Sequence, residues 1–231
     1  MFHFKQFSID DSCCAMKIGT DGVLLGAWSN VGGVNSVLDV GTGSGLIALM
    51  IAQKTENTII TGIDIDEQAI FQARENIGRS IWAERMSVMK CDFNNPVELD
   101  GLKFDLIVSN PPFFSEDIRS VDEKRNMARN TVSLPISNLI NYSDTLLDEN
   151  GRLTLVMPPE LAAMAIGEAA MHSLFLTKRC DVLTKPDTLA KRTLLEFSRT
   201  ITQTKRTTLS ICDNDGTYSS CFKQLTQDFY L

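Results

Sequence analysis

Apolar residues recur with two alternating periods between Ser36 and Phe197. Short runs rich in β-branched and other apolar residues predict strands, whereas longer segments in which apolar positions return every three to four residues predict helices. The predicted strands lie at 36–40, 58–64, 86–90, 104–109, 152–157, near 174–184 and at 192–198, and the predicted helices lie at 45–54, 67–77, 138–147 and 160–173.

This alternation predicts the fold class. Near-continuous apolar strands separated by helices are typical of a parallel sheet covered on both faces, and right-handed crossovers then give a doubly wound, Rossmann-like α/β sheet. We expect one domain over 1–231, with a core at 36–200, an N-terminal segment at 1–35 and a C-terminal extension at 201–231. The polar, aperiodic segment 114–135 is long for a loop, and such loops are often functional.

A glycine-rich loop, VLDVGTGSGL, joins the first core strand to the first core helix and contains Asp39, Gly41, Gly43 and Gly45. Ligands of open α/β sheets bind at the carboxyl ends of the strands. Glycines there permit tight turns and a close approach of the backbone to a ligand. A dinucleotide fingerprint reads G-x-G-x-x-G, whereas the spacing here is D-x-G-x-G-x-G, which disfavours a nicotinamide oxidoreductase.

Acidic residues also end the next two strands. Asp64 closes the second strand, where a carboxylate can accept hydrogen bonds from two ribose hydroxyls. Asp92 follows the third strand and precedes Phe93. Asp66, by contrast, is expected to cap the following helix. The succession of acids at three strand ends is a stronger indication of a nucleoside-binding site than any one of them.

The tetrapeptide Asn110-Pro111-Pro112-Phe113 follows the fourth strand at the same edge. An exocyclic amine on an aromatic ring is a poor nucleophile because its lone pair is delocalised into the ring. Two acceptors, the Asn110 side-chain oxygen and the Pro111 carbonyl, would orient that lone pair, and the prolines restrict the backbone that holds them. Phe113 can stack on a flat substrate.

Both motifs resemble those of class I methyltransferases that act on amino groups, in which N-P-P is followed by Tyr, Phe or Trp. The resemblance implies a mostly parallel seven-stranded sheet with helices on both faces, and S-adenosylmethionine as the methyl donor. It also implies that the glycine loop wraps the methionine and ribose parts of the donor. Asp92 would receive the adenine amino group, and Phe93 would pack beside the ring.

Four segments narrow the resemblance to the bacterial tRNA(Val) adenine(37)-N6-methyltransferase family, and they span nearly the whole chain. The likeness implies that residues 1–35 cover the cofactor or substrate, and that the region Lys17–Leu25 folds over the cofactor, with Thr20 and Asp21 as candidates. Thr20 and Asp21 could equally form a turn before a helix near Val23. The segments are FKQFSIDDSCCAMKIGTDGVLLGAW (4–28), LDVGTGSGLIALMIAQ (38–53), NPPFF (110–114) and LTQDFYL (225–231).

An RNA substrate is at odds with the net charge of −7. Between Lys178 and Arg206, however, eight basic residues accompany three acids. This stretch is either a solvated surface or a phosphate-facing edge. Phe113, Phe114, Arg125 and Arg129 are candidates for contacts with a single-stranded base, although the two arginines could also lie on a solvated helix face.

The composition argues against membrane-spanning, secreted and metal-binding proteins. No apolar run approaches the ~20 residues that cross a bilayer, and the N-terminus lacks a signal-peptide profile. We therefore expect a cytoplasmic protein without an obligate protein partner. The two histidines lie far apart, and the six cysteines contain no C-x-x-C pair, which argues against a metal site.

Several alternatives share the N-P-P chemistry. A protein glutamine N5-methyltransferase acting on release factors would carry a helical domain before the glycine loop, but only 38 residues precede Asp39. An rRNA guanine N2-methyltransferase and a DNA adenine N6-methyltransferase also remain, although DNA enzymes usually carry a larger recognition domain. A non-catalytic RNA-binding module would have no need of Asn110.

Overall fold

The structure is a computed structural model, and it describes residues 1–111 and 134–230. Within these residues eight strands form one sheet in the order β10-β8-β9-β7-β6-β3-β4-β5. Strand β9 runs antiparallel to both of its neighbours, and the other pairs are parallel. The strands are β3 (Ser36–Val40), β4 (Ile59–Asp64), β5 (Met86–Lys90), β6 (Phe104–Ser109), β7 (Leu147–Met157), β8 (Phe175–Leu183), β9 (Ala190–Ser198) and β10 (Lys205–Ser210).

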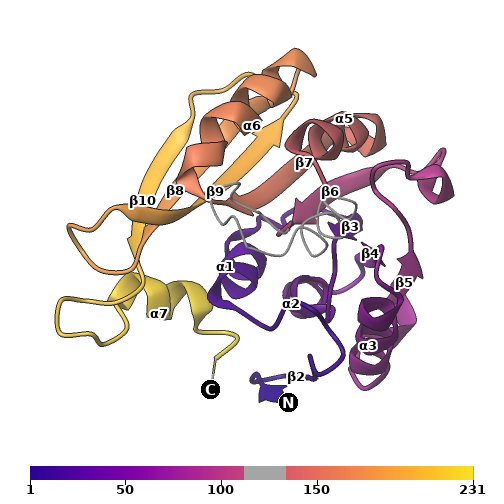
Figure 1. Cartoon of the computed structure of the whole chain (residues 1–231), viewed down its shortest axis with the longest axis horizontal. Helices are drawn as coiled ribbons and strands as arrows, with labels where there is room; N and C mark the ends of the chain where they lie inside the picture. Colours follow the sequence, from indigo (N-terminus) through magenta and orange to yellow (C-terminus); the bar gives the residue numbers. More distant parts are fainter. Residues whose placement is uncertain (112–133, 231) are drawn as a thin grey trace, which may run out of the picture.

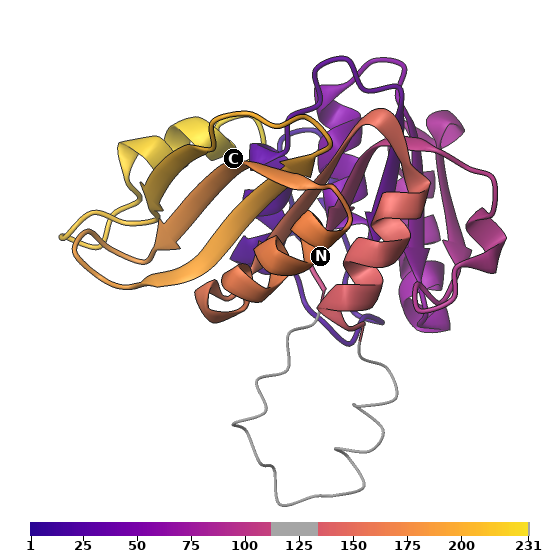
Figure 2. The same ribbon diagram turned by 90° about the horizontal axis from the view of Figure 1, so that it is seen from above.

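Helices cover both faces of the sheet, as Figures 1 and 2 show. Helices α5 (Ile136–Leu146) and α6 (Pro159–Met171) lie on one face. The other face carries α1 (Thr20–Trp28), α2 (Leu46–Lys54), α3 (Glu67–Gly78) and α7 (Ser220–Thr226). The short hairpin of β1 (Phe2–His3) and β2 (Ser8–Ile9) and the 3₁₀ turns η1 (Ala83–Arg85) and η2 (Val97–Leu99) complete the described elements.

Two hydrophobic cores follow from the alternation of side chains along the strands. In β3, Val37 packs into the core beneath α1 and α2, whereas Leu38 and Val40 pack into the core beneath α5 and α6. In β6, Val108 packs into the core beneath α1 and α2, and Ile107 packs into the core beneath α5 and α6. Successive side chains of a strand point to opposite faces, so strands buried on both faces must be apolar at nearly every position.

The α/β fold and all seven predicted strands are confirmed, but the sheet has an eighth strand. Strand β10 comes from the segment that we expected to be an extension, and it pairs in parallel with β8 from Lys205↔Lys178 to Ser210↔Leu183. Its first four residues, KRTT, are exposed. An edge strand of this kind buries too few side chains to produce a hydrophobic pattern, and so periodicity missed it.

Helix α1 packs closely on α2 through glycine. A Cβ atom built on Gly26 would lie 2.7 Å from Sδ and 3.0 Å from Cβ of Met50. One turn earlier, a Cβ on Gly22 would lie 3.0 Å from Leu46 Cδ2. The two glycines therefore set how near α1 comes to the core, and α1 follows the N-terminal segment that borders the site described below.

We expect Gly26→Ala to lower the free energy of unfolding by about 1–3 kcal/mol, because the added methyl group overpacks the contact between α1 and Met50. Urea unfolding monitored by circular dichroism measures the change. Gly167→Ala is the matched control, since Gly167 lies in helix α6 with no atom within 4 Å of an added Cβ. That variant should gain about 0.5–1 kcal/mol from helix propensity. Equal effects of the two substitutions would contradict the proposed packing.

Candidate active site

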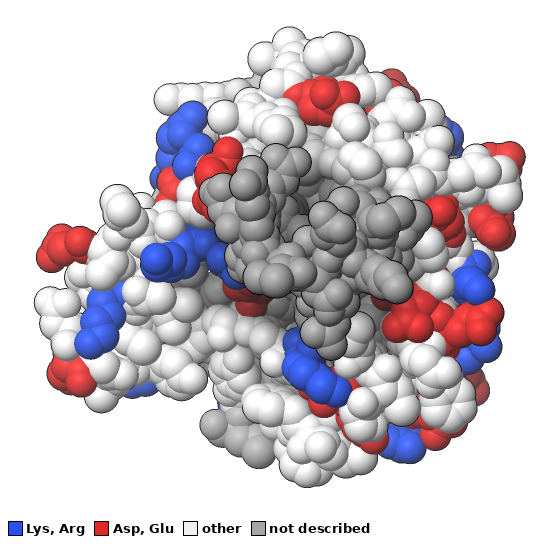
Figure 3. Space-filling model, viewed as in Figure 1, with Lys and Arg blue, Asp and Glu red and all other residues white. Residues whose placement is uncertain are grey.

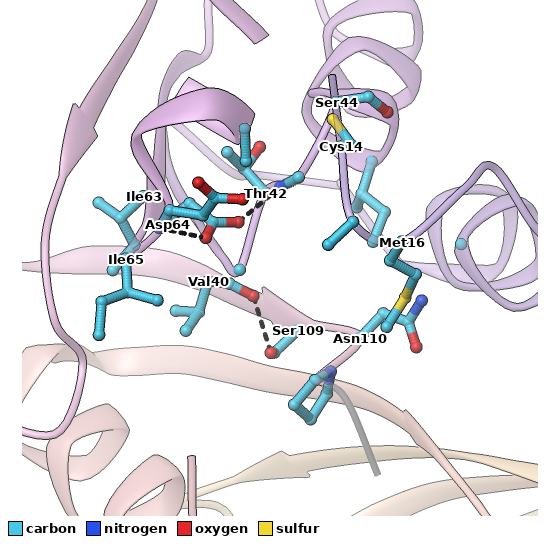
Figure 4. Close-up of a pocket in the computed structure, with 18 of the residues that line it drawn as sticks. Cys14, Met16, Val40, Thr42, Ser44, Ile63, Asp64, Ile65, Ser109 and Asn110 are labelled. Carbon is cyan, nitrogen blue, oxygen red and sulfur yellow. Dashed lines mark hydrogen bonds between the residues drawn. The ribbon is translucent and has the colours of Figure 1, made fainter. Parts of the chain in front are cut away.

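A cavity of about 730 Å³ opens at the carboxyl ends of β3, β4, β5 and β6. Its walls are the glycine loop, the residues that follow these strands, and residues 14–19 of the N-terminal segment. The volume falls within the range of small-molecule and cofactor sites, about 300–1,000 Å³. Figure 4 shows side chains from these separate segments converging on the cavity.

The backbone of the glycine loop forms one bare wall. Gly41 and Gly43 line the cavity with φ of 71° and 56°, in the left-handed region. A Cβ atom on either residue would meet no protein atom within 4 Å. A ligand can therefore approach the peptide groups closely here, as it could not if side chains were present. Gly45 has φ of 84° and lies behind this wall, against Ala73.

Asp39 lies beneath the loop and does not line the cavity. It is fully buried, and its Oδ2 atom accepts hydrogen bonds from Thr42 Oγ1 at 2.7 Å and from the Ala48 amide at 3.2 Å. Its Oδ1 atom has no partner among the described residues. Burial raises the pKa of Asp39 to about 7. Asp39 therefore supports the glycine loop from beneath through Thr42 and Ala48.

Asp64 lies at the cavity wall where β4 ends. Its Oδ2 atom accepts a hydrogen bond from the Gly43 amide at 2.9 Å, and its Oδ1 atom accepts one from the Asp66 amide at 3.0 Å. Burial raises the pKa of Asp64. A carboxylate has about four acceptor positions, so Asp64 keeps acceptor capacity for a ligand hydroxyl. The predicted cap is confirmed, because Asp66 Oδ1 accepts from the Gln68 amide at 2.9 Å at the start of α3.

Asp92 and Phe93 line the cavity after β5. Asp92 Oδ1 accepts hydrogen bonds from the amide and the side chain of Asn94, at 2.9 and 3.0 Å. Phe93 is buried and packs edge to face against Tyr142, with 6.1 Å between the ring centroids. The three strand ends that the sequence singled out therefore meet around one cavity.

Asn110 and Pro111 line the cavity where β6 ends. Ser109 Oγ donates a hydrogen bond to the Val40 carbonyl at 2.8 Å, which ties the end of β6 to β3 (Figure 4). The Asn110 side-chain amide has no hydrogen-bond partner among the described residues, and its Nδ2 atom would lie 4.0 Å from a Cβ built on Gly22. The other candidates of this region, Pro112, Phe113, Phe114, Arg125 and Arg129, lie outside the described residues.

The N-terminal candidates divide into two groups. Lys17 lines the cavity, and its Nζ atom donates to the carbonyls of Asp11 at 2.6 Å and Ser12 at 3.1 Å. Thr20 and Asp21 form the first turn of α1, and neither lines the cavity. Asp21 Oδ2 instead accepts a hydrogen bond from Arg192 Nε at 2.6 Å. Helix α1 begins at Thr20, three residues before the position expected from the sequence.

The eight basic residues of 178–206 do not gather at one edge. Lys185 and Lys191 flank the turn between β8 and β9, at the carboxyl edge, whereas Lys205 and Arg206 begin β10 at the opposite edge. Figure 3 shows Lys and Arg interspersed with Asp and Glu over the described part of the cavity face. Four of the eight form ion pairs, Lys178–Glu196, Arg179–Asp181, Arg192–Asp21 and Arg199–Asp144, at 2.6–3.0 Å.

Sequence reasoning missed the part that Gly62 plays under the loop. Gly62 pairs with Asp39 in the sheet, and a Cβ there would lie 2.8 Å from Thr42 Oγ1 and 2.9 Å from Val88 Cγ1. The sequence did contain an indication of this role, because a glycine inside a predicted strand often marks a place where other atoms approach the backbone closely. Cys14, Met16 and Ser44 also line the cavity, but nothing in their local sequence distinguishes them.

Two further features bear on the class of protein. No helix in residues 1–111 and 134–230 is long and apolar enough to cross a membrane. The same residues contain no group of three His, Cys, Asp or Glu that could hold a metal ion.

Solved structures share this architecture. A predicted O-methyltransferase of Agrobacterium tumefaciens superposes with a TM-score of 0.70 at 16% identity, over 90% of this chain and 96% of that chain. A putative class I S-adenosylmethionine-dependent methyltransferase of Listeria monocytogenes gives a TM-score of 0.57 at 14% identity, over 84% and 68%. The fold is therefore that of the class I S-adenosylmethionine-dependent methyltransferases.

The family follows from sequence. The sequence-family model of the methyltransferase small domain matches residues 18–185 of this chain. Curated relatives named tRNA1(Val) (adenine(37)-N6)-methyltransferase are 43% identical in Christiangramia forsetii and 41% in Bacteroides thetaiotaomicron, over 100% of this chain and 97% of theirs. The chain belongs to the methyltransferase small domain family and, within it, to the family of these relatives. The resemblance seen in the sequence is thereby confirmed.

The cavity fits the cofactor of this class. Its volume and bare glycine wall accommodate a nucleoside with an amino-acid tail, and Asp64 retains acceptor capacity toward the cavity. Asp39 Oδ1 is a buried acceptor without a partner directly under the loop. These observations are compatible with S-adenosylmethionine as the occupant of the cavity.

We expect Gly62→Ala to weaken cofactor binding, because the added methyl group displaces Thr42 and so disturbs the loop that Asp39 supports. The free energy of unfolding should also fall by about 1–3 kcal/mol. Isothermal titration with S-adenosylhomocysteine and urea unfolding measure the two effects. Gly216→Ala, at a position with φ of 88° and open surroundings, provides a control for strain away from the cavity.

We expect the wild-type protein to lose stability relative to Asp39→Asn as the pH rises from about 4 to about 7. The pKa of Asp39 is about 7 when folded and has its ordinary value of 3.8 when unfolded. In this window the folded state holds a proton that the unfolded chain has released, so unfolding becomes easier as the pH rises. Urea unfolding of both proteins across this range measures the difference. A constant difference would contradict the raised pKa.

Proposed function

We propose that the chain transfers the methyl group of S-adenosylmethionine to N6 of an adenine in tRNA, namely adenine 37 in the anticodon loop of tRNA1(Val). The observation that carries the chemistry is the side-chain amide of Asn110, which lines the cavity and has no hydrogen-bond partner in residues 1–111 and 134–230. The substrate follows from the full-length match to relatives of that name.

The proposal assigns cofactor contacts to four parts of the cavity. Asp64 accepts hydrogen bonds from the ribose hydroxyls with the lone pairs that Gly43 and Asp66 leave unused. The peptide groups of Gly41 and Gly43 border the amino-acid tail and the ribose. Asp92 and Phe93 serve the adenine ring, and Lys17 borders the cavity from the N-terminal segment. When bound, S-adenosylmethionine supplies an electrophilic methyl group on its sulfonium.

Asn110 and Pro111 then prepare the nucleophile. In the proposal the Asn110 Oδ1 atom and the Pro111 carbonyl accept the two N–H groups of the exocyclic amine, which turns the nitrogen lone pair toward the cavity. The Ser109 hydrogen bond to Val40 holds this strand end beside the glycine loop. Positioning of two reactants in this way can supply several kcal/mol of the acceleration. The methylated amine is more acidic and releases its proton to water or to a weak acceptor.

The proposed substrate site also includes five residues whose roles rest on the sequence alone. They are Pro112, Phe113, Phe114, Arg125 and Arg129. Proline at 112 restricts the backbone further, and Phe113 stacks on the target base. Phe114 and the two arginines provide surfaces for neighbouring bases of the loop. An anticodon-loop adenine is unpaired, so its movement into a pocket requires little unpairing energy. We expect the activity in the cytoplasm, with tRNA as the macromolecular partner.

We expect Asn110→Ala to lower methyl transfer to tRNA by at least about 100-fold, because positioned groups at a reacting centre contribute effects of this size. Binding of S-adenosylhomocysteine should change little, since the amide acts on the substrate amine. Radiolabelled S-adenosylmethionine, a tRNA pool and nucleoside analysis by mass spectrometry measure the product, N6-methyladenosine.

Asn57→Ala is the matched control, because Asn57 is an exposed residue before β4 without a hydrogen bond to its side chain. Parallel reactions with duplex DNA, ribosomal RNA and release factor separate this proposal from other amino-methyltransferases. Label confined to release factor would indicate glutamine methylation, and full activity of Asn110→Ala would exclude the assigned role.

A further inference from the structure

The buried polar side chains of α3 are not explained by the reaction. Gln72 and Asn76 lie one turn apart on the helix face that meets the N-terminal segment, and their exposed fractions are 3% and 1%. Buried amides are costly unless their donors and acceptors are satisfied. Their side-chain hydrogen bonds reach two segments that border the cavity, although neither residue lines it.

Asn76 bonds to two segments at once. Its Nδ2 atom donates to the Asp10 carbonyl at 2.7 Å and to the Ser44 carbonyl at 2.8 Å. Its Oδ1 atom accepts a hydrogen bond from the Asp10 amide at 3.0 Å. Both amide hydrogens and the carbonyl oxygen are therefore used, so the side chain is held in one orientation.

Both segments border the cavity. Residues 10–19, here named the strap, contribute Cys14 to Gly19 to the lining, and Ser44 belongs to the glycine loop. Gln72 Oε1 adds two longer bonds to the strap, accepting from Ser12 Oγ and from the Cys13 amide, both at 3.3 Å. The Asn76 side chain thus sets the separation between the strap and the loop.

We infer that Asn76 is a positioning residue for cofactor binding, which rests on the cofactor site proposed above. It holds the strap against the glycine loop in the geometry that the cofactor meets, although it touches neither cofactor nor substrate. A wall that is already ordered loses little conformational freedom when a ligand binds, whereas a wall that must be ordered lowers the affinity.

Only a side chain with both an N–H donor and a carbonyl acceptor, at the length of asparagine, can make the three hydrogen bonds of position 76. Aspartate would keep the shape but would present its oxygens to the carbonyls of Asp10 and Ser44, which offer no hydrogen. Alanine would leave both carbonyls and the Asp10 amide without partners in a buried place, where unsatisfied groups are unfavourable. Both substitutions should therefore release the strap while the residues that line the cavity stay unchanged.

The test compares Asn76→Ala and Asn76→Asp with the wild-type enzyme. Titration with S-adenosylhomocysteine should give a Kd raised about 10-fold, the effect of about one net hydrogen bond. The KM for S-adenosylmethionine should rise to a similar extent, while kcat at saturation stays within about twofold. Trypsin should cut faster after Lys17 in the free variants, and S-adenosylhomocysteine should restore protection.

Ile70→Val is the control for general loss of stability, because Ile70 is buried on the same helix and makes no contact with the strap by hydrogen bond. It should lower the melting temperature without raising Kd. An unchanged Kd and KM in both Asn76 variants, or a Kd raised equally in Ile70→Val, would overturn the inference.

The Asp64→Ala variant shows whether a failed prediction concerns Asn76 or the cofactor site itself. If Asp64→Ala weakens binding of S-adenosylhomocysteine and the Asn76 variants do not, the cofactor site stands and the positioning role fails. If Asp64→Ala leaves Kd unchanged, the placement of the cofactor itself fails.

Discussion

The geometry of the site depends on a carboxylate buried under the glycine loop. Asp39 fixes the loop from below through Thr42 and the first turn of α2, and Gly62 leaves the space that this arrangement needs. With the loop held in this way, Gly41 and Gly43 present bare backbone to the cavity, and the Gly43 amide donates to Asp64. One buried group therefore links the core of the sheet to the surface that receives the cofactor.

The parallel sheet brings the remaining chemistry to the same place. Strands β3, β4, β5 and β6 end at one edge, so residues far apart in sequence, such as Asp64 and Asn110, share one cavity. Residues 14–19 of the N-terminal segment form a further wall of this cavity, and Asn76 connects the segment to the glycine loop by hydrogen bonds to Asp10 and Ser44. In the proposed function the cofactor and substrate sites are therefore adjacent, as direct transfer of a methyl group requires.

Much of this arrangement was predictable because it rests on local rules. Periodicity predicted every strand from β3 to β9, and the acids at or near the carboxyl ends of β3, β4 and β5 were recognised by that position. Strand β10 was missed because its polar residues are exposed at the edge. The ion pair of Asp21 was not predicted, because its partner Arg192 lies 171 residues away and no local pattern indicates such a pair.

The sequence by itself determined the class of fold, the chemistry and the family, because these depend on apolar periodicity and on short motifs whose residues are neighbours in the chain. The tertiary structure alone decided which residues face the cavity. It placed Asp39 beneath the loop and Asp64 at the wall, divided the basic stretch between two edges of the sheet, and set Asn76 between the strap and Ser44. Such assignments depend on contacts between distant segments, which form only when the chain has packed.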